Sequence, residues 1–212
     1  MKKKKVEILL TDLKGFKDPR PELEQYSTPP GIASDILNIV LLDSDGKTVI
    51  ADLGSGTGML SIAAALNGFE VHSVEKDSKA VETMRMNIGS IKVETGKDLD
   101  ITIHEKDVEH FNRKVDKVVM NPPFGLQEEN NNLKFLKKAF NISKEVFALL
   151  HSSNNKKQET REFLTKFANF HKFNTRILKT YDFGIPGKMS FHEKEEKDVK
   201  VDLYYFKEQK VE

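Results

Sequence analysis

A strand, a glycine-rich turn and a helix follow one another without interruption in the first third of the chain. Residues 48–53 read Thr-Val-Ile-Ala-Asp-Leu, a run typical of a strand that is buried on both faces. Glycines at positions 54, 56 and 58 come next, and residues 59–66 are almost entirely apolar over the length of a short helix. A buried strand that turns directly into a buried helix predicts a parallel sheet with helices on both faces.

The rest of the chain continues this alternation of strand and helix. Apolar spacing predicts helices at residues 6–13, 32–42, 78–88, 133–141 and 160–170. Strands are predicted at residues 69–74, 101–104, 115–120, 145–150, 173–179 and 199–206. No helix of comparable length precedes the last strand, so we expect it to pair antiparallel to its neighbour. The expected fold is a Rossmann-like α/β sheet of seven strands, mostly parallel, with an antiparallel last strand.

Length and composition narrow the class of protein. A chain of 212 residues suits one domain, with residues 1–30 as an N-terminal helix and covering loop and residues 31–212 as the core. Thirty-four Lys and Arg residues nearly balance 33 Asp and Glu residues, so no overall field attracts nucleic acid or membrane. The absence of cysteine excludes disulfides and thiolate-bound metals. No apolar run could span a bilayer or serve as a signal peptide, and we expect a soluble, cytoplasmic protein.

Two acidic residues beside the glycine turn indicate what it binds. The third glycine comes one residue earlier than in the G-x-G-x-x-G fingerprint of dinucleotide-binding folds, and Asp52 lies next to the loop. A carboxylate there suits a ligand that bears a cationic amine. Glu75 ends the next strand, 21 residues after Gly54, where it can accept both hydroxyls of a ribose. Both acids favour S-adenosylmethionine over a phosphate-rich cofactor. The alternative is that Asp52 only caps a structural turn.

A further acidic residue follows the third predicted strand. Asp107 could accept the amino group of the cofactor adenine, and Val108 could pack on its ring. The alternative is an acidic residue that simply ends a strand.

A tetrad of the sequence Asn-Pro-Pro-Phe, formed by Asn121, Pro122, Pro123 and Phe124, follows the fourth strand directly. That position lies at the carboxyl edge of the sheet, where ligands of open α/β folds bind. An adenine amino group or an amide nitrogen is a poor nucleophile because its lone pair is delocalised. The Asn121 side-chain oxygen and the Pro122 carbonyl could each accept one N–H, and Phe124 could stack on a planar base. A simple turn is the alternative.

The segment 134–179 is strongly basic and indicates a surface for RNA. It holds eleven Lys and Arg residues against three Asp and Glu residues. Lys156, Lys157 and Arg161 are the candidate phosphate contacts, although a solvated helix face explains the same charges. Phe191 and His192 are further candidates for substrate binding. The histidines show no H-E-x-x-H spacing, so no metal site is predicted.

Four sequence blocks together resemble the methyltransferase-like protein five family, within the class I S-adenosylmethionine-dependent methyltransferases. The blocks are Glu-Gln-Tyr-x-Thr at residues 24–28, the glycine turn from residue 51 to 61, Met-Asn-Pro-Pro-Phe-Gly at residues 120–125, and Phe-His at residues 191–192 ahead of Val-Asp-Leu. The resemblance implies methylation of the N6 atom of an adenosine in small-subunit ribosomal RNA. It also implies that a small zinc-binding activator subunit accompanies eukaryotic-type relatives.

The resemblance assigns residues to two groups by position. Asn121 to Phe124 would surround the target adenine. The residues expected around the cofactor, from the resemblance and the turn together, are Gln25, Thr28, Asp52, Gly54, Gly56, Thr57, Gly58, Met59, Glu75, Asp107 and Val108.

Three other functions remain open from the sequence. A protein glutamine methyltransferase would use the same tetrad on an amide nitrogen, and a DNA adenine methyltransferase would use it on the same base. From a different class, an inactive methyltransferase fold could serve as an RNA-binding or assembly module. The intact Asp52, Glu75 and Asn121 favour an active enzyme.

Overall fold

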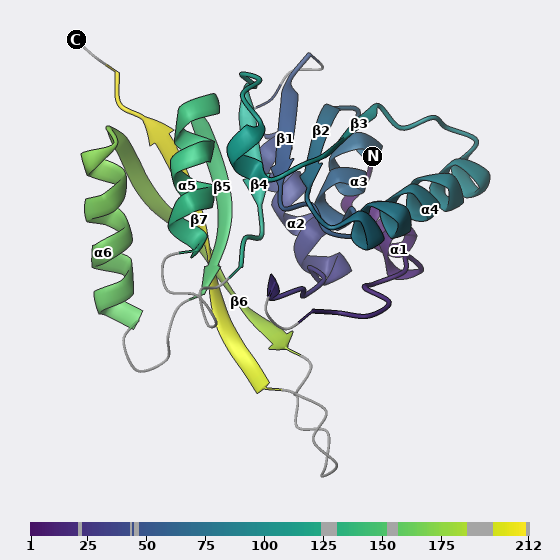
Figure 1. Ribbon diagram of the computed structural model, residues 1–212, viewed down its shortest axis with the longest axis horizontal. Helices are drawn as coiled ribbons and strands as arrows, with labels where there is room; N and C mark the ends of the chain where they lie inside the picture. The colour runs from purple at the N-terminus through teal and green to yellow at the C-terminus, as the bar shows by residue number, and fades with distance from the viewer. Residues whose placement is uncertain are drawn as a thin grey trace.

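A seven-stranded sheet runs through the computed structural model, which describes residues 1–20, 23–42, 44, 47–123, 131–151, 157–185 and 197–210 (Figure 1). The strand order is β3-β2-β1-β4-β5-β7-β6. The strands are β1 (Val49–Leu53), β2 (Glu70–Glu75), β3 (Ile101–Glu105), β4 (Lys117–Met120), β5 (Glu145–His151), β6 (Phe173–Ile185) and β7 (Lys197–Glu208). Strands β1 to β5 pair in parallel, and β7 pairs antiparallel with both β5 and β6. The predicted fold class, including the antiparallel last strand, is confirmed.

Helices cover both faces of this sheet. The helices are α1 (Lys3–Thr11), α2 (Pro30–Leu41), α3 (Met59–Leu66), α4 (Ser78–Thr95), α5 (Asn131–Ile142) and α6 (Lys157–Phe170), with a short 3-10 turn, η2 (Val108–His110). Successive strand residues point to opposite faces. Ile50 and Val119 therefore join one buried cluster with α1, α2 and α3, whereas Ala51 and Val118 join a second cluster with α5 and α6.

Most predicted elements are present, and two of them extend at least six residues further than expected. The structure extends α4 seven residues past Ile88, through Gly89, to a C-cap at Gly96 with φ of +68°. A side chain at Gly89 would meet no other atom within 4 Å, so this glycine neither ends the helix nor marks a close contact. Strand β6 continues past Lys179 because its ladder with β7 runs on to the pair Ile185 and Lys197.

The parallel strands bring several polar residues to one edge of the sheet. Strands β1, β2 and β4 end at Leu53, Glu75 and Met120, and the next residues form the turns at that edge. Strand β6 runs in the same direction as β5, so its last residue lies toward the same edge. Among the described helices, none combines the length and the apolar character needed to cross a bilayer.

Candidate active site

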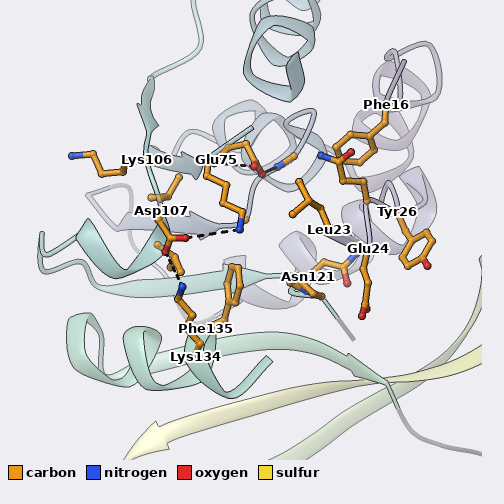
Figure 2. A pocket seen from close by; sticks show the side chains of 17 residues that line it. Phe16, Leu23, Glu24, Tyr26, Glu75, Lys106, Asp107, Asn121, Lys134 and Phe135 are labelled. Atoms are coloured by element: carbon orange, nitrogen blue, oxygen red, sulfur yellow. Dashed lines mark hydrogen bonds and ion pairs between the residues drawn. The ribbon is translucent and has the colours of Figure 1, made fainter. Parts of the chain in front are cut away.

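A cavity opens at the carboxyl edge of the sheet, and most of the predicted cofactor residues line it (Figure 2). Its space, including the part open to solvent, is about 700 Å³. The lining comes from the N-terminal loop, the glycine turn, the ends of β2 and β4, the turn after β3, and the N-terminal part of α5. The residues are Phe16, Leu23, Glu24, Gln25, Tyr26, Gly54, Gly56, Val74, Glu75, Lys76, Lys106, Asp107, Val108, Asn121, Pro123, Lys134 and Phe135.

Gly54 and Gly58 stand at two positions of the glycine turn that do not tolerate a side chain. Gly54 has φ of +73°, and a Cβ atom there would lie 2.9 Å from the Phe135 ring. Gly58 has φ of +94°, and its Cβ atom would lie 2.6 Å from the Cγ atom of Met84. Both positions combine a left-handed backbone with a close neighbour. The backbone N–H groups of Gly54 and Ser55 donate to the Val74 carbonyl, which holds the turn against β2.

Glu75 is fixed in the cavity by backbone hydrogen bonds. Its Oε2 atom accepts the Gly56 N–H at 2.8 Å, and Oε1 accepts the N–H groups of Lys76 and Asp77 at 2.9 Å. Burial raises the pKa of this carboxyl, and the three N–H donors oppose the rise. The side chain thus has one orientation, and it links the glycine turn to the end of β2.

Asp52 lies beneath the turn, 1% exposed, with half of its carboxylate unpaired. Its Oδ2 atom accepts a hydrogen bond from the Ser61 hydroxyl at 2.6 Å, and Ser73 in turn donates to Ser61. Its Oδ1 atom has no hydrogen-bond partner among the described residues. Burial raises the pKa of Asp52 to about 7; the nearby charge of Glu75 adds to the rise, and the bonds from Ser61 oppose it. A cationic group beside Oδ1 would favour the ionised form.

Asn121 presents an unused acceptor to the same space. Its Nδ2 group donates to the Thr28 hydroxyl at 3.0 Å, which orients the amide. The opposite atom, Oδ1, is buried and has no partner within the described part of the chain. Leaving a buried acceptor unpaired costs about 1–3 kcal/mol. The site is therefore prepared for a hydrogen-bond donor from outside the protein. Pro123 lines the cavity, and Phe124 lies outside the described residues.

The N-terminal loop closes the cavity from the side opposite the sheet. Gln25 accepts the Arg20 N–H through its oxygen and donates to Asp77 at 2.6 Å. Thr28, Thr57 and Met59 line a smaller neighbouring space of about 310 Å³ that Asn121 also lines. All the described cofactor candidates thus line one of these two spaces except Gly58, which shapes the turn but lines neither.

Several lining residues were not predicted as site residues from the sequence, among them Phe16, Lys134 and Phe135. Phe16 extends from the N-terminal loop, and its ring would lie 2.7 Å from a Cβ atom at Gly56. Lys134 and Phe135 extend from the first turn of α5, as Figure 2 shows. In the sequence, Lys134 belongs to the basic segment 134–179 and Phe135 to a predicted helix, and neither pattern indicates a role in a cavity.

Of the residues predicted to contact RNA, the structure describes only two. Lys157 begins α6. Arg161 forms a two-point ion pair with Asp202, at 2.8 and 2.9 Å, and Asp202 is fully buried. Lys156, Phe191 and His192 lie outside the described residues. Neither Lys157 nor Arg161 lines the cavity. Within the described ranges, no group of three or more His, Asp or Glu residues could hold a metal ion.

The sheet, the glycine turn flanked by two acids and the Asn-Pro-Pro element define a class I methyltransferase. Residues 31–177 match the family model described as the methyltransferase small domain. The chain is 31% identical to the rRNA N(6)-adenosine-methyltransferase METTL5 of Danio rerio, covering 97% of this chain and 99% of that protein. It is 30% identical to Mettl5 of Drosophila melanogaster, with 97% and 96% covered. The chain belongs to the METTL5 family of methyltransferases.

A solved structure agrees with this assignment. A putative RNA methyltransferase from Pyrococcus horikoshii is 39% identical and superimposes with a TM-score of 0.85, covering 99% of this chain and 98% of that one.

S-adenosylmethionine, the cofactor of this enzyme class, fits the cavity and the smaller neighbouring space, which Asp52 lines, by the chemistry of their linings. The unpaired Asp52 oxygen suits a cationic group, the fixed Glu75 carboxylate suits a diol, and Val108 and Phe135 offer apolar contacts for a ring.

The raised pKa of Asp52 predicts a pH dependence of cofactor binding. An acid whose pKa is raised on folding stabilises the folded apo state at pH values below its unfolded pKa, near 4. This contribution is lost as the pH rises through the folded pKa of about 7. When a cationic ligand binds, the Asp52 carboxyl must ionise, and it releases its proton. We expect the affinity for S-adenosylmethionine to increase by up to about tenfold per pH unit below pH 7 and then to level off.

Titration calorimetry between pH 5.5 and 8.5, in two buffers of different ionisation enthalpy, measures both the affinity and the proton release. Asp52→Asn keeps the shape of the side chain and should flatten the pH profile. An equally steep profile in that variant would contradict the assignment.

Proposed function

We propose that this protein transfers the methyl group of S-adenosylmethionine to the N6 atom of an adenosine in RNA, and that the target is small-subunit ribosomal RNA. The observation that carries the proposal is the buried, unpaired Oδ1 atom of Asn121 beside the cofactor cavity. An amino group of a planar base supplies the missing donor. The METTL5 relatives, which are named as rRNA N(6)-adenosine-methyltransferases, support RNA as the substrate.

The tetrad makes the target nitrogen a better nucleophile. Asn121 Oδ1 accepts one N6–H, and the Pro122 carbonyl accepts the other, which favours a pyramidal nitrogen with its lone pair aimed at the methyl group. The two prolines stiffen the backbone, and Phe124 stacks on the flipped base. S-adenosylmethionine supplies an electrophilic methyl group on a sulfonium. Transfer would break the S–CH₃ bond as the N6–CH₃ bond forms, leave S-adenosylhomocysteine as the product, and release the surplus N6 proton to water.

The remaining site residues orient the cofactor. Glu75 accepts the two ribose hydroxyls, and Asp107 accepts the amino group of the cofactor adenine. Val108 packs on the adenine ring. Asp52 faces the methionine end of the cofactor, where the charge is positive. The buried Thr28 holds the Asn121 amide in place, so it connects the cofactor side of the cavity with the target side.

The same chemistry could serve a protein glutamine or a base in DNA, and one experiment separates these substrates. The protein is incubated with methyl-labelled S-adenosylmethionine and, in separate arms, with small-subunit rRNA, large-subunit rRNA, DNA or total protein. The nucleic acids are then digested to nucleosides. We expect label in N6-methyladenosine from small-subunit rRNA. Label in glutamine or in deoxyadenosine would overturn the proposal, and label only in large-subunit rRNA would overturn the choice of subunit.

A separate experiment tests whether a zinc-binding activator subunit associates with this protein. We propose that such a subunit can join this chain and supply its own zinc. Adding it should raise the melting temperature of the mixture if the two proteins associate. An unchanged melting temperature and an unchanged methylation rate would exclude it as a partner.

Within the basic segment 134–179, the part around α6 is proposed to face the phosphate backbone. Lys157 and the exposed Lys166 lie on α6, and neither takes part in an ion pair that the structure shows among the described residues. Replacing Lys156 and Lys157 with Ala should reduce the slope of log affinity against log salt by about 1.4–1.8, or about 0.7–0.9 for each lost phosphate contact. Cofactor affinity should not change. Lys97→Ala, beyond the end of α4, is the matched control, and an equal salt slope in both variants would move the RNA surface elsewhere.

A further inference from the structure

The first turn of α5 forms part of the cavity wall, and Lys134 is the polar residue that it contributes. The Lys134 ammonium lies 3.2 Å from Asp107 Oδ1 and 2.9 Å from Glu109 Oε2. Its side chain is 34% exposed, so the ion pairs are partly shielded from water. Figure 2 shows Lys134 reaching from the helix toward Asp107 at one end of the cavity. These contacts join α5 to the turn that follows β3.

The two oxygens of Asp107 differ in what they contact. Oδ1 accepts the Glu109 N–H at 3.0 Å and also faces Lys134. Among the described residues, none donates a hydrogen bond to Oδ2, and the Lys76 ammonium lies 3.9 Å from it, beyond hydrogen-bond distance. Burial alone would raise the pKa of Asp107, but the Glu109 N–H and the Lys134 ammonium lower it, and Lys76 adds to the lowering. One oxygen is therefore held by the protein, and the other is free to accept a donor.

We propose that Lys134 is a positioning residue of the cofactor site: it holds Asp107 by Oδ1 so that Oδ2 accepts the 6-amino group of the cofactor adenine. This inference rests on the proposed function in one respect, the placement of the adenine beside Asp107. The adjacent Phe135 supports it, because its ring packs against Gly54 and fixes the same turn of α5 in the cavity wall. Lys134 thus acts through Asp107.

Helix α5 also bears a natural control residue. Lys138 lies one turn further along, where its ammonium donates to the Glu109 carbonyl and to Asn112 Oδ1, both at 2.8 Å. It therefore ties the same helix to the same segment without contacting Asp107. Lys138 does not line the cavity. A purely structural role of Lys134, as a link between α5 and η2, would be shared by Lys138, whereas a positioning role would not.

The test uses calorimetry with two ligands, S-adenosylhomocysteine and its analogue with hypoxanthine in place of adenine, which lacks the 6-amino group. Wild type should prefer the adenine ligand by about tenfold or more, the loss expected when a hydrogen-bonding site meets an analogue without the donor. Lys134→Ala should weaken binding of the adenine ligand by about tenfold and leave the other nearly unchanged. Lys134→Arg should restore most of the preference, and Lys138→Ala should retain it.

A double-mutant cycle completes the test. In the Asp107→Ala background, Lys134→Ala should have no further effect on either ligand, because the group it positions is gone. If Lys134→Ala weakens both ligands equally, or still weakens binding when Asp107 is absent, the inference is wrong. If wild type binds neither ligand, the proposed cofactor site fails instead. Melting temperatures of all variants show whether each one is folded. If Lys134→Ala does not fold, Lys134→Arg keeps the test valid.

Discussion

Asn121→Ala is expected to lower kcat and kcat/KM for RNA methylation together, by about 10²-fold or more, because an interaction made in the transition state is lost. Cofactor affinity should change little, since Glu75 and Asp107 lie on other turns of the cavity. Single-turnover methyl transfer to an RNA stem-loop that contains the target adenosine measures the first effect. Calorimetric titration with S-adenosylmethionine measures the second.

Two further variants sharpen this test. Asn121→Asp keeps an acceptor but adds a charge in a buried place, so it should retain more activity than Ala. Thr28→Val removes the hydroxyl that accepts from the Asn121 amide nitrogen, so the amide loses its fixed orientation and activity should fall by a smaller factor. Near-normal transfer by Asn121→Ala would exclude the catalytic assignment. Loss of cofactor binding in that variant would show that Asn121 supports the cavity instead.

Arg161→Ala is expected to destabilise the protein by about 3 kcal/mol, because it leaves a buried charge without its partner. Asp202 is fully buried in β7, and Arg161 contacts both of its carboxylate oxygens. The Thr180 hydroxyl remains as a donor to Asp202, so the carboxylate keeps one bond. For a chain of this length, such a loss lowers the melting temperature by about 10 °C. Thermal and urea unfolding measure the effect.

The control for this prediction removes both charges. Arg161→Ala combined with Asp202→Asn should be more stable than Arg161→Ala alone, because no unpaired buried carboxylate remains. The pKa of Asp202 is lowered by the hydrogen bonds of Arg161 and Thr180, against the effect of burial. Its contribution is therefore present above the unfolded pKa and is lost as the pH falls through the folded one. If Arg161→Ala has wild-type stability and a reduced salt slope for RNA binding, this prediction is wrong and Arg161 belongs to the RNA-binding surface.

The sequence was most informative where strand and helix are buried. The predicted helix at residues 59–66 coincides with α3, because its apolar residues leave no exposed face to blur its ends. The gathering of Asp52, Glu75 and Asn121 could also be predicted, since the carboxyl ends of parallel strands meet at one edge. Pattern and topology together were enough for this part of the site.

Contacts between distant segments could not be predicted in this way. Lys134 was part of a basic segment expected to face RNA, yet it pairs with Asp107, which lies 27 residues earlier. Arg161 was a candidate phosphate contact, and it pairs with Asp202 from a strand 41 residues later. Charge counted along the chain does not show which charges are neutralised in space. The place of Phe16 in the cavity wall could not be predicted either, because only the folded N-terminal loop brings it to the glycine turn.

The position of β7 between β5 and β6 sets the order in which the sheet can be completed (Figure 1). Strand β6 is made before β7, but β7 is its only partner among the strands that the structure describes. During synthesis, therefore, β6 leaves the ribosome with both edges unpaired until residues 197–208 follow. The buried Asp202 is among those residues, so Arg161 also has no ion-pair partner at Asp202 until they are synthesised. A nascent chain that stalls before β7 should be open to proteases and chaperones along this side, although its parallel strands β1 to β5 could already be paired.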